Sequence, residues 1–174
     1  MTFQLEASLN KGYTMNNSGD KIETRARELG IEIPITPKPQ GNYTPALVVG
    51  NLVFTSGMGP ILHGIRHNLG YVGGDVTIEK ASDSAEIAVL NALSALRSPL
   101  ESLDQIERII RLTGYVRSAP GFGSQTSVID AASNLLVELF GEKGTHVRSA
   151  IGVAELPFGI PVEIELIAQI KNNE

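Results

Sequence analysis

Cysteine is absent from the 174 residues of the chain, and this absence excludes disulfide bonds, thiol catalysis and metal sites built on thiolates. Long apolar runs are absent as well, because none approaches the roughly 18 residues that a membrane-spanning helix needs. The N-terminal segment is polar and lacks the apolar core of a signal peptide. The sequence therefore predicts a cytoplasmic protein without a membrane span.

Positive charge is also scarce. The chain has 14 Lys and Arg residues against 19 Asp and Glu residues, which gives a net charge of −5. The basic residues are scattered and form no cluster beyond isolated pairs. Because a surface that binds phosphates draws its affinity largely from Lys and Arg, this distribution argues against nucleic acid as a partner.

One motif has the spacing of a zinc site. His63 and His67 are four residues apart, which suits chelation of zinc when both lie on one helix. A glycine interrupts this segment, a proline precedes it and no third ligand is evident, so we predict that the chain binds no metal. The pair Gly73-Gly74 lacks the spacing of a phosphate-binding loop, and we expect no cofactor.

The length of the chain suits one domain with an N-terminal arm. Residues 1–19 have no periodicity and predict a mobile arm, whereas residues 20–174 are expected to form the domain. Asp20 is placed to cap a short helix that ends near Leu29, with Gly30 as its left-handed terminator. Three prolines in the following segment force an extended chain.

The next part of the chain predicts a hairpin and a loop. Residues 47–54 are apolar on both sides of Gly50-Asn51, a pair suited to the positive φ angles of a two-residue turn, and they predict a β-hairpin. The glycine-rich segment over residues 60–74 is expected to be an enlarged loop with one short strand near residues 69–72.

Two helices are predicted after this loop. Residues 77–97 repeat apolar side chains at steps of three and four, which indicates a helix capped by Thr77 and stopped by Pro99. A second apolar stripe predicts a helix over residues 126–140, which Gly141 terminates. Both helices then have an apolar face to pack against a sheet.

Three further strands complete the predicted fold. Residues 106–117 alternate, with Ile109 placed on the face opposite Ile106 and Ile110, so both faces of this strand are expected to be covered. We expect helices to cover one face and another subunit to cover the other. The last two strands are predicted over residues 149–153 and 162–170. The order of elements favours an α+β fold with an antiparallel or mixed sheet and two helices on one face.

The last quarter of the chain has the residues for binding a small acid. Arg148 comes before a strand, a Leu-Pro turn follows, and the final strand has Glu163 and Glu165 on the face opposite its apolar residues. A guanidinium can bind a carboxylate with two parallel hydrogen bonds, and a nearby carboxylate can hold or activate a water. These groups could form a site that needs neither metal nor cofactor. The alternative is an ordinary surface arginine and a solvated row of glutamates.

This region resembles the C-terminal signature of the YjgF/RidA family, the reactive-intermediate deaminases formerly grouped as L-PSP endoribonucleases. In that signature an Arg-Ser pair opens a strand, a Leu-Pro turn follows, and a Glu lies fifteen residues after the Arg, as Glu163 does after Arg148. Residues 41–57 resemble the N-terminal hairpin of the family, with Tyr43 and Ser56 at matching spacing. The resemblance covers roughly residues 39–170.

The resemblance implies a chorismate-mutase-like homotrimer, in which three sheets form a central barrel and the active sites lie between subunits. It implies that Arg148 binds the substrate carboxylate and that Glu163 positions the attacking water. Tyr43 would close the pocket from a neighbouring subunit, and Ser56 with Gly57 would contact substrate or water. Ala150 stands where many relatives have a cysteine whose main chain faces the ligand.

Some residues depart from the family pattern. Asn42 replaces the usual proline of the hairpin, and Met58 replaces a common glutamine. The asparagine that the family has on its second helix corresponds to either Asp130 or Asn134. The longer N-terminal part and the enlarged loop indicate a longer-chain branch of the family.

The resemblance implies hydrolytic deamination of enamine or imine intermediates of the 2-aminoacrylate type, giving 2-keto acids and ammonia. A first alternative is a homotrimer that binds a small carboxylate, such as an imino, enamino or 2-keto acid, without catalysis. A second alternative is an endoribonuclease, the older name of the family, which the acidic composition opposes.

Overall fold

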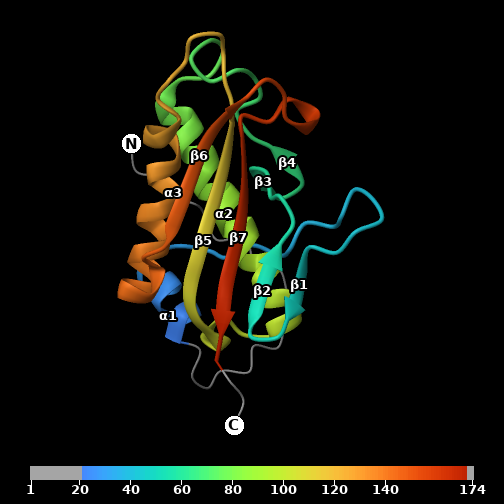
Figure 1. Cartoon of the computed structure of the whole chain (residues 1–174), viewed down its shortest axis with the longest axis vertical. Helices are drawn as coiled ribbons and strands as arrows, with labels where there is room; N and C mark the ends of the chain where they lie inside the picture. The colour runs from blue at the N-terminus through green and yellow to red at the C-terminus, as the bar shows by residue number, and fades with distance from the viewer. Residues whose placement is uncertain (1–20, 172–174) are drawn as a thin grey trace.

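A computed structural model describes residues 21–171 of the chain (Figure 1). The arm predicted over residues 1–19, and Asp20 as a helix cap, lie outside the described residues. The first helix, α1 (Lys21–Glu28), is followed by Gly30 at a φ of 71°, as predicted. Its first amides, those of Lys21 and Ile22, donate to the carboxylate of Asp104 at 2.6 and 3.0 Å. A residue distant in sequence therefore caps α1.

The main sheet has five strands in the order β1-β2-β7-β5-β6. Three of its four neighbouring pairs are antiparallel, and only the pair β5–β6 is parallel. The sheet is therefore mixed, one of the two arrangements that the sequence predicts. The strands are β1 (Ala46–Val49), β2 (Leu52–Thr55), β5 (Ile106–Arg117), β6 (Val147–Val153) and β7 (Val162–Ile170).

The predicted hairpin is confirmed. Val49 of β1 pairs with Leu52 of β2, and Gly50 between them has a φ of 59°, which a glycine adopts without strain. Strand β6 begins two residues earlier than predicted, so Arg148 lies inside this strand and not before it. Strand β7 has the predicted bounds.

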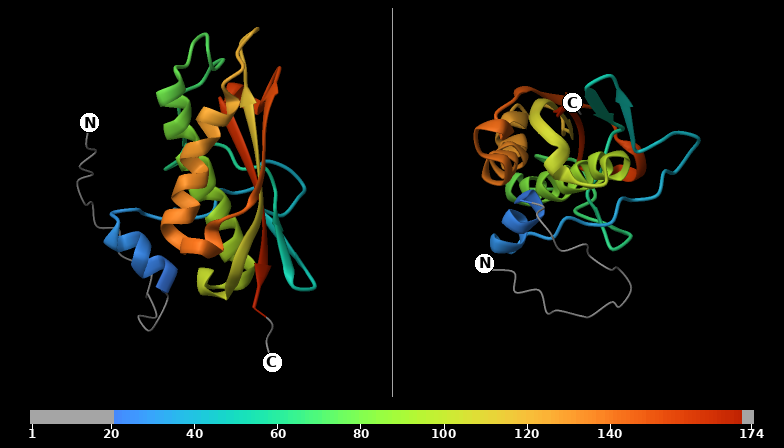
Figure 2. Two further views of the ribbon diagram at one scale, coloured as in Figure 1. Left: turned by 60° about the vertical axis from the view of Figure 1, so that its left-hand side comes forward. Right: turned by 90° about the horizontal axis from the view of Figure 1, so that it is seen from below.

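Two long helices, α2 (Ile78–Leu100) and α3 (Gln125–Phe140), pack on one face of the sheet (Figure 2). Thr77 caps α2 as predicted, because its side chain accepts a hydrogen bond from the amide of Lys80. Pro99 does not stop the helix. It lies in the last turn, and α2 ends where Glu101 adopts a left-handed conformation with a φ of 64°.

The core lies between these helices and alternate residues of the central strands β5 and β7. Val162, Ile164 and Leu166 of β7 face the helices and are buried. Helix α3 approaches β5 closely at Gly114, where a Cβ atom would lie 2.5 Å from the Cδ1 of Ile129. Only a glycine allows this contact, so Gly114 sets the spacing between α3 and the sheet.

The prediction of which residues share a face of β5 is wrong at the N-terminal end of this strand. Ile106 and Ile109 were placed on opposite faces, yet both are buried on the helix side. The ladder between β5 and β7 has irregularities between Ile106 and Arg108 and between Ile109 and Arg111. Each irregularity shifts the alternation by one residue, which a strict period of two cannot predict.

The loop over residues 60–74 differs from its prediction. It contains a small hairpin of β3 (Ile61–Leu62) and β4 (Ile65–Arg66), and not a strand near residues 69–72. His63 and Gly64 form its turn, with φ angles of 51° and 80°. His-Gly is not a common pair for such a turn, so this hairpin was hard to predict from the sequence.

Short 3₁₀ helices complete the described chain: η1 (Leu103–Gln105), η2 (Gly141–Gly144) and η3 (Pro157–Gly159). A cluster of Tyr71, Arg117 and Glu155 ties the enlarged loop to the sheet. The Arg117 guanidinium lies 3.7 Å from the centre of the Tyr71 ring and binds Glu155 at 2.7 Å, and the Tyr71 hydroxyl donates to Glu155. No described helix is long and apolar enough to cross a membrane.

The face of the sheet opposite the helices is left bare by the described residues (Figure 2). Phe54 pairs with Leu47 on one side and with Ile167 on the other, which places an apolar row on this face. Large apolar side chains remain exposed there, including Leu47 at 58% and Ile151 at 44%. An exposed apolar area of this kind is typical of a surface that another chain covers.

Candidate active site

Glu163 lies on the bare face of the sheet. It stands on β7 between Val162 and Ile164, which face the helices, and it pairs with Tyr115 of β5. The carboxyl group is half-buried. This burial, and then the negative charge of Glu165, raise the pKa of Glu163. A raised pKa brings the carboxyl closer to the neutral range in which a general base exchanges protons efficiently.

The neighbouring Glu165 has a different environment. The hydroxyl of Tyr115 donates a hydrogen bond to Oε2 of Glu165 at 3.2 Å. Burial and the charge of Glu165 raise the pKa of Tyr115, which keeps the phenol protonated as the donor. The carboxyl group of Glu163 forms no hydrogen bond within residues 21–171, so its oxygens remain available for a water or a substrate.

Gly57 forms the wall beside the Glu163 carboxyl. A Cβ atom at Gly57 would lie 2.3 Å from Oε1 of Glu163. The next residue, Met58, exchanges two backbone hydrogen bonds of 2.9 Å with Ile164, which hold this segment against β7. The backbone therefore approaches the carboxyl so closely that a side chain at position 57 would displace that of Glu163.

Gly57→Ala is therefore expected to displace the Glu163 side chain while the fold survives. The atom that the new Cβ meets is the flexible end of a side chain, so we expect a loss of stability of about 1 kcal/mol or less. Thermal unfolding followed by circular dichroism measures this loss, and the assay described below measures activity. A variant with normal activity would show that the position of Glu163 is unimportant.

Tyr43 and Gly57 line one small cavity of about 50 Å³. This volume holds about one or two water molecules and not a substrate. Tyr43 is 52% exposed, and its hydroxyl accepts a hydrogen bond from the amide of Gln40 at 3.3 Å. The hydroxyl of Ser56 donates to the carbonyl of Thr44 at 2.7 Å, so its proton is used within the hairpin. The structure thus places Gly57 beside the Glu163 carboxyl and in the lining of the cavity that Tyr43 also lines, with Ser56 adjacent in the chain.

Arg148 lies elsewhere, on the edge strand β6 and beside helix α3. Its Nη1 donates to Oδ1 of Asp130 at 2.7 Å and to the hydroxyl of Ser133 at 3.1 Å. The side chain is 24% exposed. Its Nε and Nη2 form no hydrogen bond or ion pair within the described part of the chain. One edge of the guanidinium is therefore fixed, and the other remains able to bind a carboxylate.

A short hydrogen-bond chain supports this arginine. The Nδ1 of His146 lies 2.6 Å from the carbonyl of Gly144, which can only accept, so we assign the proton of the neutral ring to Nδ1. The Nε2 of His146 then accepts from the hydroxyl of Ser133 at 3.1 Å, and Ser133 in turn accepts from Arg148. His146 thus helps to orient the Ser133 hydroxyl, which in turn accepts the hydrogen bond from Arg148.

Within one chain, the residues predicted to act together lie in two separate places. Arg148 pairs with Leu112, which pairs with Leu166, and both leucines are buried on the helix side of the sheet. Ala150 shares this side and packs against the core. Glu163 lies on the opposite side. Arg148 and Glu163 of the same chain therefore cannot bind one small ligand together, and a site that contains both needs a second chain.

Tyr115 and Ser133 were not predicted as site residues. For the position of the family asparagine on the second helix, the sequence did not decide between Asp130 and Asn134. Asp130 is the residue that contacts Arg148. Ser133 follows Asp130 by three positions, so both lie on one helix face, and this spacing was the available signal. Tyr115 had no comparable signal, because its role depends on the register of β5 against β7. Between residues 21 and 171, no group of three or more His, Asp or Glu side chains is placed to hold a metal ion.

Comparison with known proteins agrees with this fold. Residues 23–170 match the model of the family described as "YjgF/chorismate_mutase-like, putative endoribonuclease". One similar protein is Atu1372 from Agrobacterium tumefaciens, a protein of unknown function whose crystal structure superposes on this one with a TM-score of 0.82. Its sequence is 40% identical, and the match covers 87% of this chain and 94% of the Atu1372 chain.

Two curated relatives are also similar. Protein TCP17 of Trypanosoma cruzi is 31% identical over 87% of this chain and 96% of its own length. A protein of Dermatophagoides farinae named 2-iminobutanoate/2-iminopropanoate deaminase is 28% identical over 81% of this chain and 95% of its own. The matched family model spans nearly the whole described chain, and the α+β fold with its mixed sheet and helical layer agrees with it. The chain belongs to the YjgF/chorismate-mutase-like family.

Proposed function

We propose that the protein hydrolyses enamine and imine intermediates of the 2-aminoacrylate type to 2-keto acids and ammonia. The observation that carries this proposal is the half-buried Glu163 carboxyl, which lies against Gly57 and whose pKa burial raises. Membership of the family and the relative named as a deaminase of 2-imino acids support the substrate class. Arg148 is the residue proposed to bind the substrate carboxylate.

The proposed chemistry needs only a water and a proton carrier. An imine next to a carboxylate is already electrophilic, so a water can attack its carbon once Glu163 accepts a proton from that water. The new C–O bond gives a tetrahedral carbinolamine. Glu163 returns the proton of the water to the nitrogen to complete this intermediate. It then takes the hydroxyl proton of the carbinolamine and passes it to the amine, so that the C–N bond breaks and ammonia leaves as the carbonyl forms. The sum is imino acid plus water giving 2-keto acid plus ammonia, without a cofactor.

We further propose that the site lies between subunits of a homotrimer. Arg148 and Ala150 of one subunit would face Tyr43, Ser56, Gly57 and Glu163 of the next. The separation of Arg148 and Glu163 on opposite sides of the sheet supports this arrangement, as do the exposed apolar side chains of the bare face. In a ring of three chains each interface would form one complete site.

A coupled assay tests the proposed activity. A pyridoxal-phosphate lyase generates 2-aminoacrylate, and the formation of pyruvate is followed with and without the protein. We expect acceleration over the spontaneous rate. Arg148→Ala should lower kcat/KM by about 10- to 100-fold or more, because charge-assisted hydrogen bonds to the carboxylate are lost. Arg25→Ala is the matched control, since Arg25 has a 48% exposed side chain on α1 and pairs only loosely with Glu28, at 3.9 Å.

The same preparation separates the competing functions. If the wild-type protein binds pyruvate through Arg148 but gives no acceleration, it is a carboxylate-binding protein and not a deaminase. The endoribonuclease function predicts RNA cleavage by purified protein without metal, and loss of that cleavage in Arg148→Ala. The surplus of acidic residues opposes this second function.

A further inference from the structure

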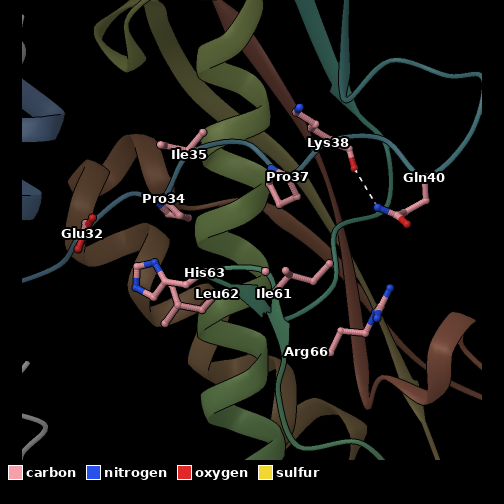
Figure 3. Close-up of a pocket in the computed structure, with 11 residues that line it drawn as sticks. Glu32, Pro34, Ile35, Pro37, Lys38, Gln40, Ile61, Leu62, His63 and Arg66 are labelled. Carbon is pink, nitrogen blue, oxygen red and sulfur yellow. Dashed lines mark hydrogen bonds between the residues drawn. The ribbon is translucent and has the colours of Figure 1, made fainter. Parts of the chain in front are cut away.

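A larger cavity is lined by neither Arg148 nor Glu163. It has a volume of about 350 Å³, within the range of about 300–1,000 Å³ typical of sites for small organic molecules. The proline-rich segment after α1 forms one wall, and the β3–β4 hairpin forms the other (Figure 3). The cavity therefore exists because the enlarged loop folds as a hairpin and stands opposite an extended chain.

The lining of this cavity is apolar in its middle and charged at its ends. Pro34, Ile61 and Leu62 supply apolar surface. Glu32 and Arg66 lie at opposite ends in Figure 3. A ligand that fits this distribution has a compact apolar body and a negative group on the side away from Glu32.

Arg66 is the residue that would bind the negative group. Its guanidinium carbon lies 4.0 Å from the centre of the Phe158 ring, so the aromatic ring orients the guanidinium by stacking. Its Nε is buried and has no hydrogen-bond partner within residues 21–171. Because this buried Nε is closed to solvent, an anion in the cavity would meet the terminal amino groups of the guanidinium, which form charge-assisted hydrogen bonds with carboxylates.

We infer that this cavity is a second ligand site, which binds a small organic carboxylate with its charged group on Arg66 and its apolar body against the proline-rich segment. The inference does not depend on the proposed deaminase activity. The cavity shares Pro37, Lys38, Gln40 and Ile61 with the small cavity beside Tyr43 and Gly57. A carboxylate bound in the larger cavity therefore lies next to the proposed active site.

Phenylacetate is a suitable probe, because it joins one carboxylate to one compact ring. Titration followed by calorimetry and by amide chemical shifts should show saturable binding, with shifts at residues 31–40 and 61–66. Phenylacetamide has the same shape without the charge and should bind at least about tenfold more weakly. This comparison uses only the wild-type protein, so it does not depend on how a variant folds.

Variants then assign the charge that binds the probe. Arg66→Ala should weaken phenylacetate binding by about tenfold or more, whereas Arg25→Ala should leave it unchanged. Arg148→Ala should also leave it unchanged, and this separates the cavity from the proposed catalytic site. Absence of binding, equal binding of the amide, or loss of binding in Arg148→Ala and not in Arg66→Ala would each overturn the inference.

Discussion

Co-expression of Arg148→Ala chains with Glu163→Gln chains is expected to restore an activity that neither variant has alone. In a ring where each site takes its arginine from one subunit and its glutamate from the next, a mixed trimer contains sites with both residues intact. Random mixing of equal amounts should leave about a quarter of the sites complete. The coupled assay should therefore give about a quarter of the wild-type activity, which is more than the residual activity of either parent.

A chain with both substitutions, co-expressed with either single variant, is the control for this experiment. A mixture of the double variant with Arg148→Ala contains no intact arginine, so it should stay inactive in every assembly. If the two single variants mixed together regain no activity, although differently tagged chains of the two variants co-purify as mixed trimers, the site does not lie between subunits. The proposed arrangement of Arg148 and Glu163 would then be wrong.

Glu163→Gln is expected to lower kcat by about 10²- to 10⁴-fold, the usual contribution of a general acid–base group. Glutamine keeps the shape of the side chain but cannot carry the proton from the water to the amine. In the wild-type protein, kcat/KM should fall as the pH drops through the raised pKa of Glu163, because the protonated carboxyl cannot act as the base. This fall should come at a higher pH than the ordinary value of 4.5 would give.

The same substitution should stabilise the protein at neutral pH. Burial raises the pKa of Glu163, so between the ordinary value and the raised value the folded chain binds more protons than the unfolded chain. The free energy of unfolding therefore falls as the pH rises through this window, and the loss is complete above it. Glutamine does not titrate and avoids this loss.

Thermal unfolding of the wild type and of Glu163→Gln across pH 4 to 8 measures the effect. The difference in Tm should be small near pH 4 and should grow in favour of the variant as the pH rises. Glu107→Gln is a suitable control, because Glu107 has a 44% exposed side chain and pairs with Lys143 at the surface. If Glu163→Gln is less stable than the wild type at neutral pH, the charge of Glu163 stabilises the folded protein and this prediction is wrong.

Local patterns in the sequence predicted most of the secondary structure. The hairpin around Gly50, the cap at Thr77 and the end of α3 at Gly141 each depend on residues that are near one another in the chain. The failures depend on distant contacts. The faces of β5, for example, are set by irregularities against β7, a strand that comes much later in the chain.

The sequence predicted which residues belong to the candidate site but not where they lie relative to one another. The motif drew attention to Arg148 and Glu163, but the side of the sheet that each occupies follows from strand register across three strands. The bond from Arg148 to Asp130 depends on how α3 lies over β6. The cavity at Arg66 could not be predicted, because it requires that the loop form a hairpin opposite a segment about thirty residues earlier.

The glycine at position 114 has a role in this arrangement although it touches none of the proposed catalytic residues. By admitting Ile129 it fixes the height of α3 above the strands, and Asp130 is the next residue on that helix. A larger residue at 114 would lift the helix and stretch the bridge that holds one edge of the arginine. If Arg148 binds an acid as proposed, a change in the distance between sheet and helix in the protein core should alter its affinity.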